Sequence, residues 1–128
     1  MRIFKTKWFT RFARQEGIDD EKLVETVQSI ESGLIDADYG GGLIKQRIAK
    51  DGGGKSGGYR SAIAFRSETR SIFLFAFPKS DQENLTIVEK RDYKKAAALY
   101  LGMTETQLQN ALDKGALIEV NYAQKIQK

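Results

Sequence analysis

The basic side chains of this sequence are concentrated in one glycine-rich stretch, residues 40–66, which reads GGGLIKQRIAKDGGGKSGGYRSAIAFR. Two runs that alternate polar and apolar residues flank a glycine-rich tip, which is the pattern of a β-hairpin. Lysine and arginine attract phosphate oxygens, and arginine binds them through two parallel hydrogen bonds. Against the single acid Asp51, the stretch carries six cations: Lys45, Arg47, Lys50, Lys55, Arg60 and Arg66. This excess of positive charge therefore predicts that the hairpin binds a polyanion.

Three of these cations are candidates for chemistry on a phosphate. Lys45 and Arg47 lie two residues apart, so they share one face of the first strand. A neighbouring positive charge favours the neutral form of a lysine, which makes Lys45 a candidate general base and Arg47 a phosphate clamp. Arg60 follows Gly57, Gly58 and Tyr59, and the small residues ahead of it would let a nucleic acid backbone approach. For all three, the alternative is a cation on a solvated strand face.

The composition excludes several other kinds of site. The 128 residues include no cysteine and no histidine, which removes disulfides, thiolate metal sites and the commonest general base. The acids form no convergent set by spacing, and we predict neither a metal ion nor a cofactor. No apolar run approaches the roughly 20 residues that span a bilayer. Charges break the apolar run of the basic N-terminus, which makes it a poor signal peptide. We expect a location in the cytoplasm and no membrane contact.

The net charge of +4 conceals an uneven distribution along the chain. Residues 1–14 carry five basic groups and no acid, whereas residues 15–42 carry eight acids and one lysine. Residues 43–70 return to seven basic groups and two acids. This segregation predicts one cationic face, which favours phosphate backbones or an acidic protein partner. The alternative, that these charges are only solvated faces, stays open from charge alone.

The glycine-rich tip resembles two nucleotide-binding motifs. Gly52, Gly54 and Gly57 formally match GxGxxG, and the same segment nearly matches a phosphate-binding P-loop. Both motifs require the glycines to open a helix whose N-terminus holds the phosphate. Here strand-like alternation follows the glycines, and Ala49 occupies the leading glycine position of the P-loop. We therefore interpret the segment as a hairpin tip.

The segments before and inside this stretch predict mixed α and β structure. A short strand at Arg2–Lys5 is followed by a helix that ends near Gly17. A second helix begins after the N-cap Asp19 and ends near Gly33, and a loop with Tyr39 leads into the hairpin. The two hairpin strands and a third strand then form an antiparallel meander.

The third strand, Ser71–Phe77, is apolar on both faces and should be the central strand. Two helices are predicted after it, at Ile87–Leu101 and Glu105–Lys114, and then an edge strand at Ala116–Val120. The expected fold class is α+β, with residues 1–128 forming a single domain. A small antiparallel β-sheet, made of the three-strand meander plus edge strands, packs against two N-terminal helices, with C-terminal helices beside it.

The motifs of the central region resemble those of the RelE/ParE superfamily of bacterial type II toxins. GGLIKQRIA matches the pattern GGLxKxRxA, and GKSGGYR and IFLFAFPKSDQENLT follow in the order typical of a RelE-like subgroup. The similarity covers about residues 34–101. It implies a single RelE-like toxin domain with the fold described above.

The resemblance also implies an activity and partners. Most such toxins cleave mRNA in the ribosomal decoding site, and an antitoxin, often a helix-turn-helix protein, blocks them. The implied function is that of a toxin–antitoxin toxin acting as a metal-independent endoribonuclease by 2′-hydroxyl attack on phosphate. A second branch of the superfamily poisons DNA gyrase and shares the fold. A non-catalytic module that binds nucleic acid or antitoxin is the third possibility.

The predicted site combines the residues and the resemblance. By resemblance Arg60 is the phosphate-stabilising arginine, and Lys79 matches a basic position near the active site. RNA-cleaving members place a tyrosine where this chain has Asn84 and Leu85, and Tyr93 comes later. The predicted catalytic residues are Lys45, Arg47, Arg60 and Lys79. The predicted nucleic-acid-binding residues are Lys50, Lys55, Tyr59 and Arg66, although Tyr59 also fits a core position.

Overall fold

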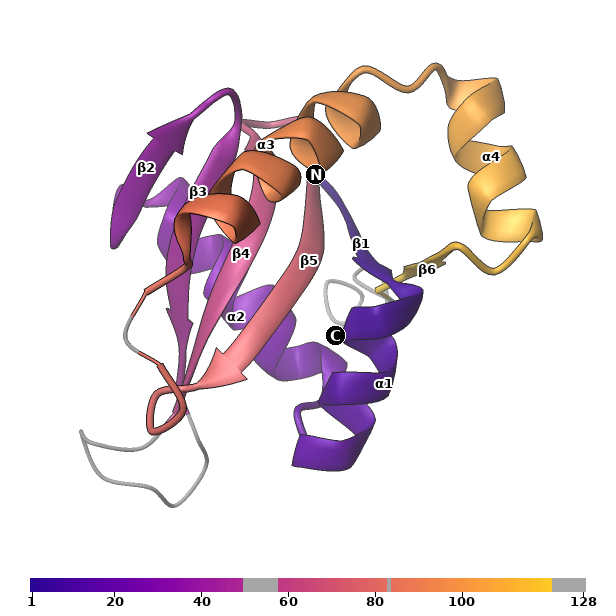
Figure 1. Cartoon of the computed structure of the whole chain (residues 1–128). Coiled ribbons are helices and arrows are strands. Elements are labelled where there is room, and N and C mark those ends of the chain that lie inside the picture. Colours follow the sequence, from indigo (N-terminus) through magenta and orange to yellow (C-terminus); the bar gives the residue numbers. More distant parts are fainter. Residues whose placement is uncertain (50–57, 83, 121–128) are drawn as a thin grey trace.

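One β-sheet organises the chain, and helices cover both of its faces (Figure 1). The computed structural model describes residues 1–49, 58–82 and 84–120. The strands found there are β1 (Arg2–Thr6), β2 (Ala37–Gly40), β3 (Leu43–Ile48), β4 (Tyr59–Arg66), β5 (Arg70–Pro78) and β6 (Leu117–Glu119). They lie side by side in the order β2-β3-β4-β5-β1-β6. The predicted α+β fold is confirmed.

Strands β3, β4 and β5 form the predicted antiparallel meander. Arg47 of β3 lies opposite Arg60 of β4, and Arg60 lies opposite Phe77 of β5. The register between β4 and β5 shifts at Leu74, a bulged residue that has no partner in β4. This bulge reverses the alternation of β5, so that Ile72 and Phe77 belong to the same apolar cluster although five positions separate them. Directly paired residues share a face, so Phe77, Arg60 and Arg47 lie on one face of the sheet.

Two features of the sheet differ from the prediction. Strand β1 lies between β5 and β6, and it runs parallel to β5, with Arg2 opposite Arg70. The sheet is therefore mostly, but not purely, antiparallel. In addition, Ala37–Gly40 forms the edge strand β2 where a loop around Tyr39 was predicted. The residues of β2 are exposed or half-buried, so the strand lacks the apolar alternation that would predict it.

The helices begin and end at the predicted signals. Their bounds are Lys7–Glu16 for α1, Asp20–Glu31 for α2, Ile87–Leu101 for α3 and Glu105–Asp113 for α4. The Asp19 side chain caps α2 by accepting from the backbone N–H of Lys22. At the other end of α2, Gly33 has a φ of +97° and the N–H of Leu34 bonds to the Ser29 carbonyl, which closes the helix. No helix in the described parts of the chain is long and apolar enough to cross a membrane.

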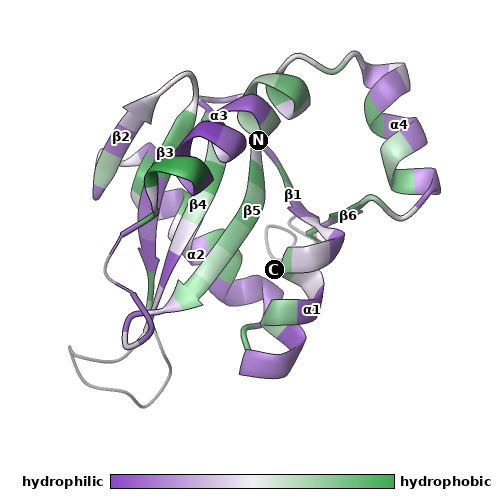
Figure 2. Ribbon diagram, in the orientation of Figure 1, coloured by the Kyte–Doolittle hydropathy of each residue, from purple (hydrophilic) through white to green (hydrophobic). Residues whose placement is uncertain are grey.

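The apolar side chains form one cluster on each face of the sheet. Figure 2 shows apolar residues running along the central strands of the sheet. Helices α1 and α2 cover one face, where the large buried side chains include Phe9, Leu23, Ile48, Ile63 and Phe73. Helices α3 and α4 complete the other cluster, which contains Phe4, Leu43, Ile72, Leu108 and Leu117. Strand β5 contributes to both clusters and is interior, as predicted.

Two arginines hold the C-terminal end of α3 against the sheet. Arg66, at the end of β4, donates to the carbonyl oxygen of Leu101 at 2.8 Å. Arg70, at the start of β5, donates to the carbonyl oxygens of Tyr100 at 2.9 Å and Met103 at 3.0 Å. The last carbonyls of a helix lack partners within it and carry partial negative charge, so cations stabilise them. These contacts fix α3 beside the meander.

Gly42, in the GGL motif, marks a point where α3 approaches the hairpin closely. Its φ is +87°, and an added Cβ would collide with Cδ1 of Leu101. We expect Gly42→Ala to lower the free energy of unfolding by about 2–4 kcal/mol, because left-handed strain and overpacking both contribute. The matched control is Gly41→Ala, since Gly41 has a φ of +64° and open space around its Cα. It should lose only about 1–2 kcal/mol. Equal losses in chemical denaturation would contradict the collision.

Candidate active site

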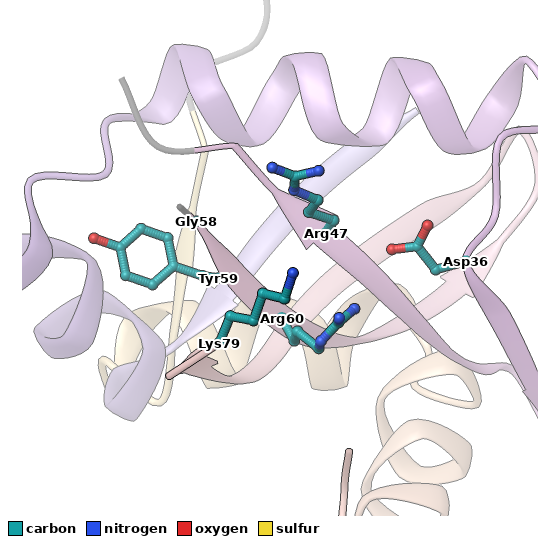
Figure 3. Close-up of a pocket in the computed structure, with 6 residues that line it drawn as sticks. All are labelled: Asp36, Arg47, Gly58, Tyr59, Arg60 and Lys79. Carbon is teal, nitrogen blue, oxygen red and sulfur yellow. The ribbon is translucent and has the colours of Figure 1, made fainter. Parts of the chain in front are cut away.

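A cationic pocket opens where the end of β3, the start of β4 and the end of β5 meet. Figure 3 shows the side chains around it. The pocket has a volume of about 220 Å³ and is lined by Asp36, Arg47, Gly58, Tyr59, Arg60 and Lys79. Three of the four predicted catalytic residues, Arg47, Arg60 and Lys79, therefore converge on one pocket, although three different strands supply them.

The register of the meander brings these cations together. Arg47 and Arg60 lie directly opposite each other on β3 and β4. Lys79 follows Pro78, the last residue of β5, and its backbone N–H donates to the carbonyl oxygen of Gly58 at 3.3 Å. This bond extends the pairing of β4 and β5 by one residue beyond the strand. Lys79 thus lies two residues past Phe77, the partner of Arg60, and side chains two apart share a face.

The guanidinium of Arg60 has an unmet hydrogen bond. Its Nε is buried and has no hydrogen-bond partner. A buried donor without a partner costs free energy, and for a charged group the cost is larger. The positive charge of Arg60 also reaches Tyr39, where it opposes the rise in the pKa of that hydroxyl that burial causes. This unpaired donor belongs to a residue that lines the pocket.

The family of the chain agrees with this geometry. A family model described as the RelE toxin of the RelE/RelB toxin–antitoxin system matches residues 1–120. The chain belongs to the RelE toxin family. A comparison with curated proteins gives no match. Membership confirms the predicted resemblance and identifies the chain as the toxin of a toxin–antitoxin module, with an antitoxin as its partner.

Lys45, the predicted general base, lies beside the pocket and does not line it. It is on the same face of β3 as Arg47, as predicted, but its Nζ donates to Oδ1 of Asn84 at 2.7 Å. Asn84 stands where RNA-cleaving members of the RelE/ParE superfamily are expected to carry a tyrosine, and it has no proton of suitable acidity to give. Leu85 is buried. Tyr93 stacks on Phe75 at 5.0 Å, and burial raises its pKa above the usual value.

Two predicted nucleic-acid-binding residues, Tyr59 and Arg66, make contacts within the protein. Tyr59 is 4% exposed, and its hydroxyl donates to Glu16 at 3.0 Å on the face covered by α1 and α2. Figure 3 shows its ring pointing away from the cations, so it presents no free face on which a base could stack. Arg66 lies at the opposite end of β4 from Arg60 and is bonded to Leu101. Arg66 therefore lies away from the pocket.

The other two predicted binding residues, Lys50 and Lys55, lie outside the described residues. Two residues that line the pocket, Gly58 and Asp36, were not among the predicted site residues. Asp36 precedes β2 and brings a carboxylate to the three cations. In the sequence it belongs to the acidic region 15–42, where nothing distinguishes it from exposed helix acids. In the parts of the chain that the structure describes, no group of acids could hold a metal ion.

Proposed function

We propose that this RelE-family toxin is a metal-independent endoribonuclease that cleaves mRNA bound to the ribosome. The single observation that carries the proposal is the buried, unpartnered Nε of Arg60 in a pocket shared with Arg47 and Lys79. Three cations around one small cavity fit a phosphate group, and the guanidinium fork of arginine matches two phosphate oxygens. The family match supports the toxin role, and the pocket supports the RNA chemistry.

The proposed reaction is attack of a ribose 2′-hydroxyl on the adjacent phosphorus. As the O2′–P bond forms and the P–O5′ bond breaks, negative charge grows on the phosphate oxygens. Donors that already surround the phosphate stabilise this charge without reorganisation. Arg60 and Arg47 border the pocket from two paired strands and would hold the phosphate, and Lys79 would neutralise the leaving oxygen. Lys45, beside the pocket, is positioned for the neighbouring phosphate of the RNA.

Induced expression of the toxin without antitoxin tests this proposal. We expect growth arrest and new mRNA ends within minutes, with a 5′-hydroxyl on one product and a 2′,3′-cyclic phosphate on the other. Sequencing of RNA ends in growing cells detects both. Coexpression of the antitoxin, which we predict to be a helix-turn-helix protein, should restore intact mRNA.

Two other outcomes would contradict RNA cleavage. Double-strand DNA breaks with intact mRNA would instead support a toxin directed at DNA gyrase. Harmless expression of the folded protein would support a non-catalytic module that binds nucleic acid or antitoxin. Arrest with intact RNA and intact DNA would contradict the nuclease proposal as well.

A further inference from the structure

Among the described residues that line the pocket, Asp36 is the single one with an acidic side chain. Figure 3 shows its carboxylate pointing into the space that Arg47 and Arg60 border. Among the described residues no hydrogen bond or ion pair engages this carboxylate, so its oxygens are available to a ligand. A carboxylate oxygen can accept a proton, whereas the other charged side chains that line the pocket are two arginines and a lysine, which act as hydrogen-bond donors.

The position of Asp36 is fixed by a buried glutamine. The backbone N–H of Asp36 donates to Oε1 of Gln46 at 3.1 Å, and Nε2 of Gln46 donates to the carbonyl oxygen of Leu34 at 2.7 Å. Gln46 is 5% exposed, and the hydroxyl of Ser61 donates to the backbone carbonyl oxygen of Gln46 at 2.7 Å. Both ends of the Gln46 amide are thus used to hold the segment before β2. Gln46 is a positioning residue for Asp36.

Lys45 is a weaker candidate than Asp36 for the group that accepts the proton. Its ammonium donates to Asn84, and it does not line the pocket. A general base must reach the proton that it removes, directly or through one water molecule. Asp36 is exposed to solvent and lines the pocket together with Arg60, to which the proposed reaction assigns the phosphate. Its position in the pocket therefore makes Asp36 a better candidate for the general base than Lys45.

We propose that Asp36 is the general base of this toxin, a step that rests on the proposed ribonuclease function. The carboxylate of Asp36 accepts the proton of the 2′-hydroxyl while O2′ bonds to phosphorus and the P–O5′ bond breaks. The ammonium of Lys79 donates a proton to the departing O5′. The products are a 2′,3′-cyclic phosphate and a 5′-hydroxyl. Asp36 then releases its proton to solvent and Lys79 takes up a proton from solvent, so atoms and charge balance.

The test compares Asp36→Asn with the parent toxin in a translating cell-free extract programmed with one mRNA. Asparagine keeps the shape of the side chain and removes its basicity, so we expect cleavage to slow by roughly 100- to 10,000-fold. Binding of a non-cleavable RNA, with a 2′-deoxyribose at the cleavage position, should be as tight or tighter, because a negative charge leaves the phosphate pocket. Asp36→Glu should recover part of the rate.

The matched control is Asp38→Asn, on the same edge strand. Asp38 is exposed, and its side chain accepts from the backbone N–H of Gly40 at 2.8 Å outside the pocket. We expect its cleavage rate to equal that of the parent toxin. A fast Asp36→Asn variant would overturn the Asp36 proposal while leaving the ribonuclease function intact, provided that the parent toxin cleaves. The Asp36 proposal would also be overturned if Asp36→Asn cleaved slowly only because it bound RNA less tightly. The same holds if Lys45→Met lost all cleavage activity and Asp36→Asn lost none. A parent toxin that cleaves no RNA would instead overturn the proposed function.

Discussion

Arg60→Met should abolish the toxicity of this protein without harming its fold. The substitution keeps an unbranched side chain and removes the guanidinium that the pocket presents to the phosphate. Loss of one preorganised donor in other enzymes slows the chemical step by roughly 100- to 1,000-fold, and Arg60 also supplies charge. We expect cells that express Arg60→Met to grow, and purified protein to leave mRNA intact in a translating extract.

The same substitution should not lower stability. The buried Nε of Arg60 has no partner in the free protein, and an unsatisfied buried donor costs about 1–3 kcal/mol. Methionine removes this cost, so the free energy of unfolding of Arg60→Met should equal or exceed that of the parent. Chemical denaturation measures the difference. An inactive variant that is also unfolded would contradict this account of Arg60.

Arg66→Met is the matched control for Arg60→Met. Both arginines belong to β4, but Arg66 lies at the other end of the strand and donates to Leu101 at the end of α3. We expect Arg66→Met to cleave mRNA at the parent rate while losing about 1–3 kcal/mol, the value of a hydrogen bond to a charged group. Equal losses of cleavage in the two variants would extend the RNA site along the whole strand.

Phe9→Ala should have the largest effect on stability. Phe9 is 0% exposed, and its ring contacts those of Phe73 at 5.1 Å and Phe12 at 6.2 Å. It joins α1 to the central strand. Truncation of a fully buried phenylalanine leaves a cavity and costs about 3–5 kcal/mol. This amount is a large share of the stability of a small protein. We expect thermal and chemical denaturation of Phe9→Ala to show a loss in this range, with aggregation on expression.

The neighbouring aromatic residue provides the control. Trp8 is larger than Phe9 but 44% exposed, and it stacks on Phe12 at 5.4 Å and contacts Phe75 at 4.8 Å. Because much of its ring remains in water, Trp8→Ala should cost only about 1–2 kcal/mol, the value of its aromatic contacts. If Trp8→Ala proved the more damaging change, the face that α1 buries would differ from the one described.

The local parts of the fold could be predicted because each carries its own signal. Caps such as Asp19 and Thr86 start helices, and alternating residues define β3 and β4. The pairing of β1 with β5 could not be predicted in the same way, since a strand of five residues does not specify its neighbour. Strand β2 was missed because it buries too little apolar surface to show a pattern.

In the site too, the positions of residues along the strands could be predicted, whereas the partners of their side chains could not. Alternation on β3 and β4 predicts the common face of Arg47 and Arg60, and the register then brings them opposite each other. The contact of Lys45 with Asn84 depends on where a later loop passes, which no local pattern contains. Asp36 was missed for a similar reason, because only the pairing of Ala37 with Lys45 brings it near the cations.

The position of β1 has a consequence for the order of folding. Both of its partner strands lie far from it in the sequence, with Arg70 opposite Arg2 and Glu119 opposite Phe4. The meander pairs residues that are close in sequence, so it can form while the rest is still being synthesised. Strand β1 must wait for both partners, and α1, which follows it directly, waits as well. We expect a nascent toxin to form the meander and its pocket before β1 and α1 are held in place by β6.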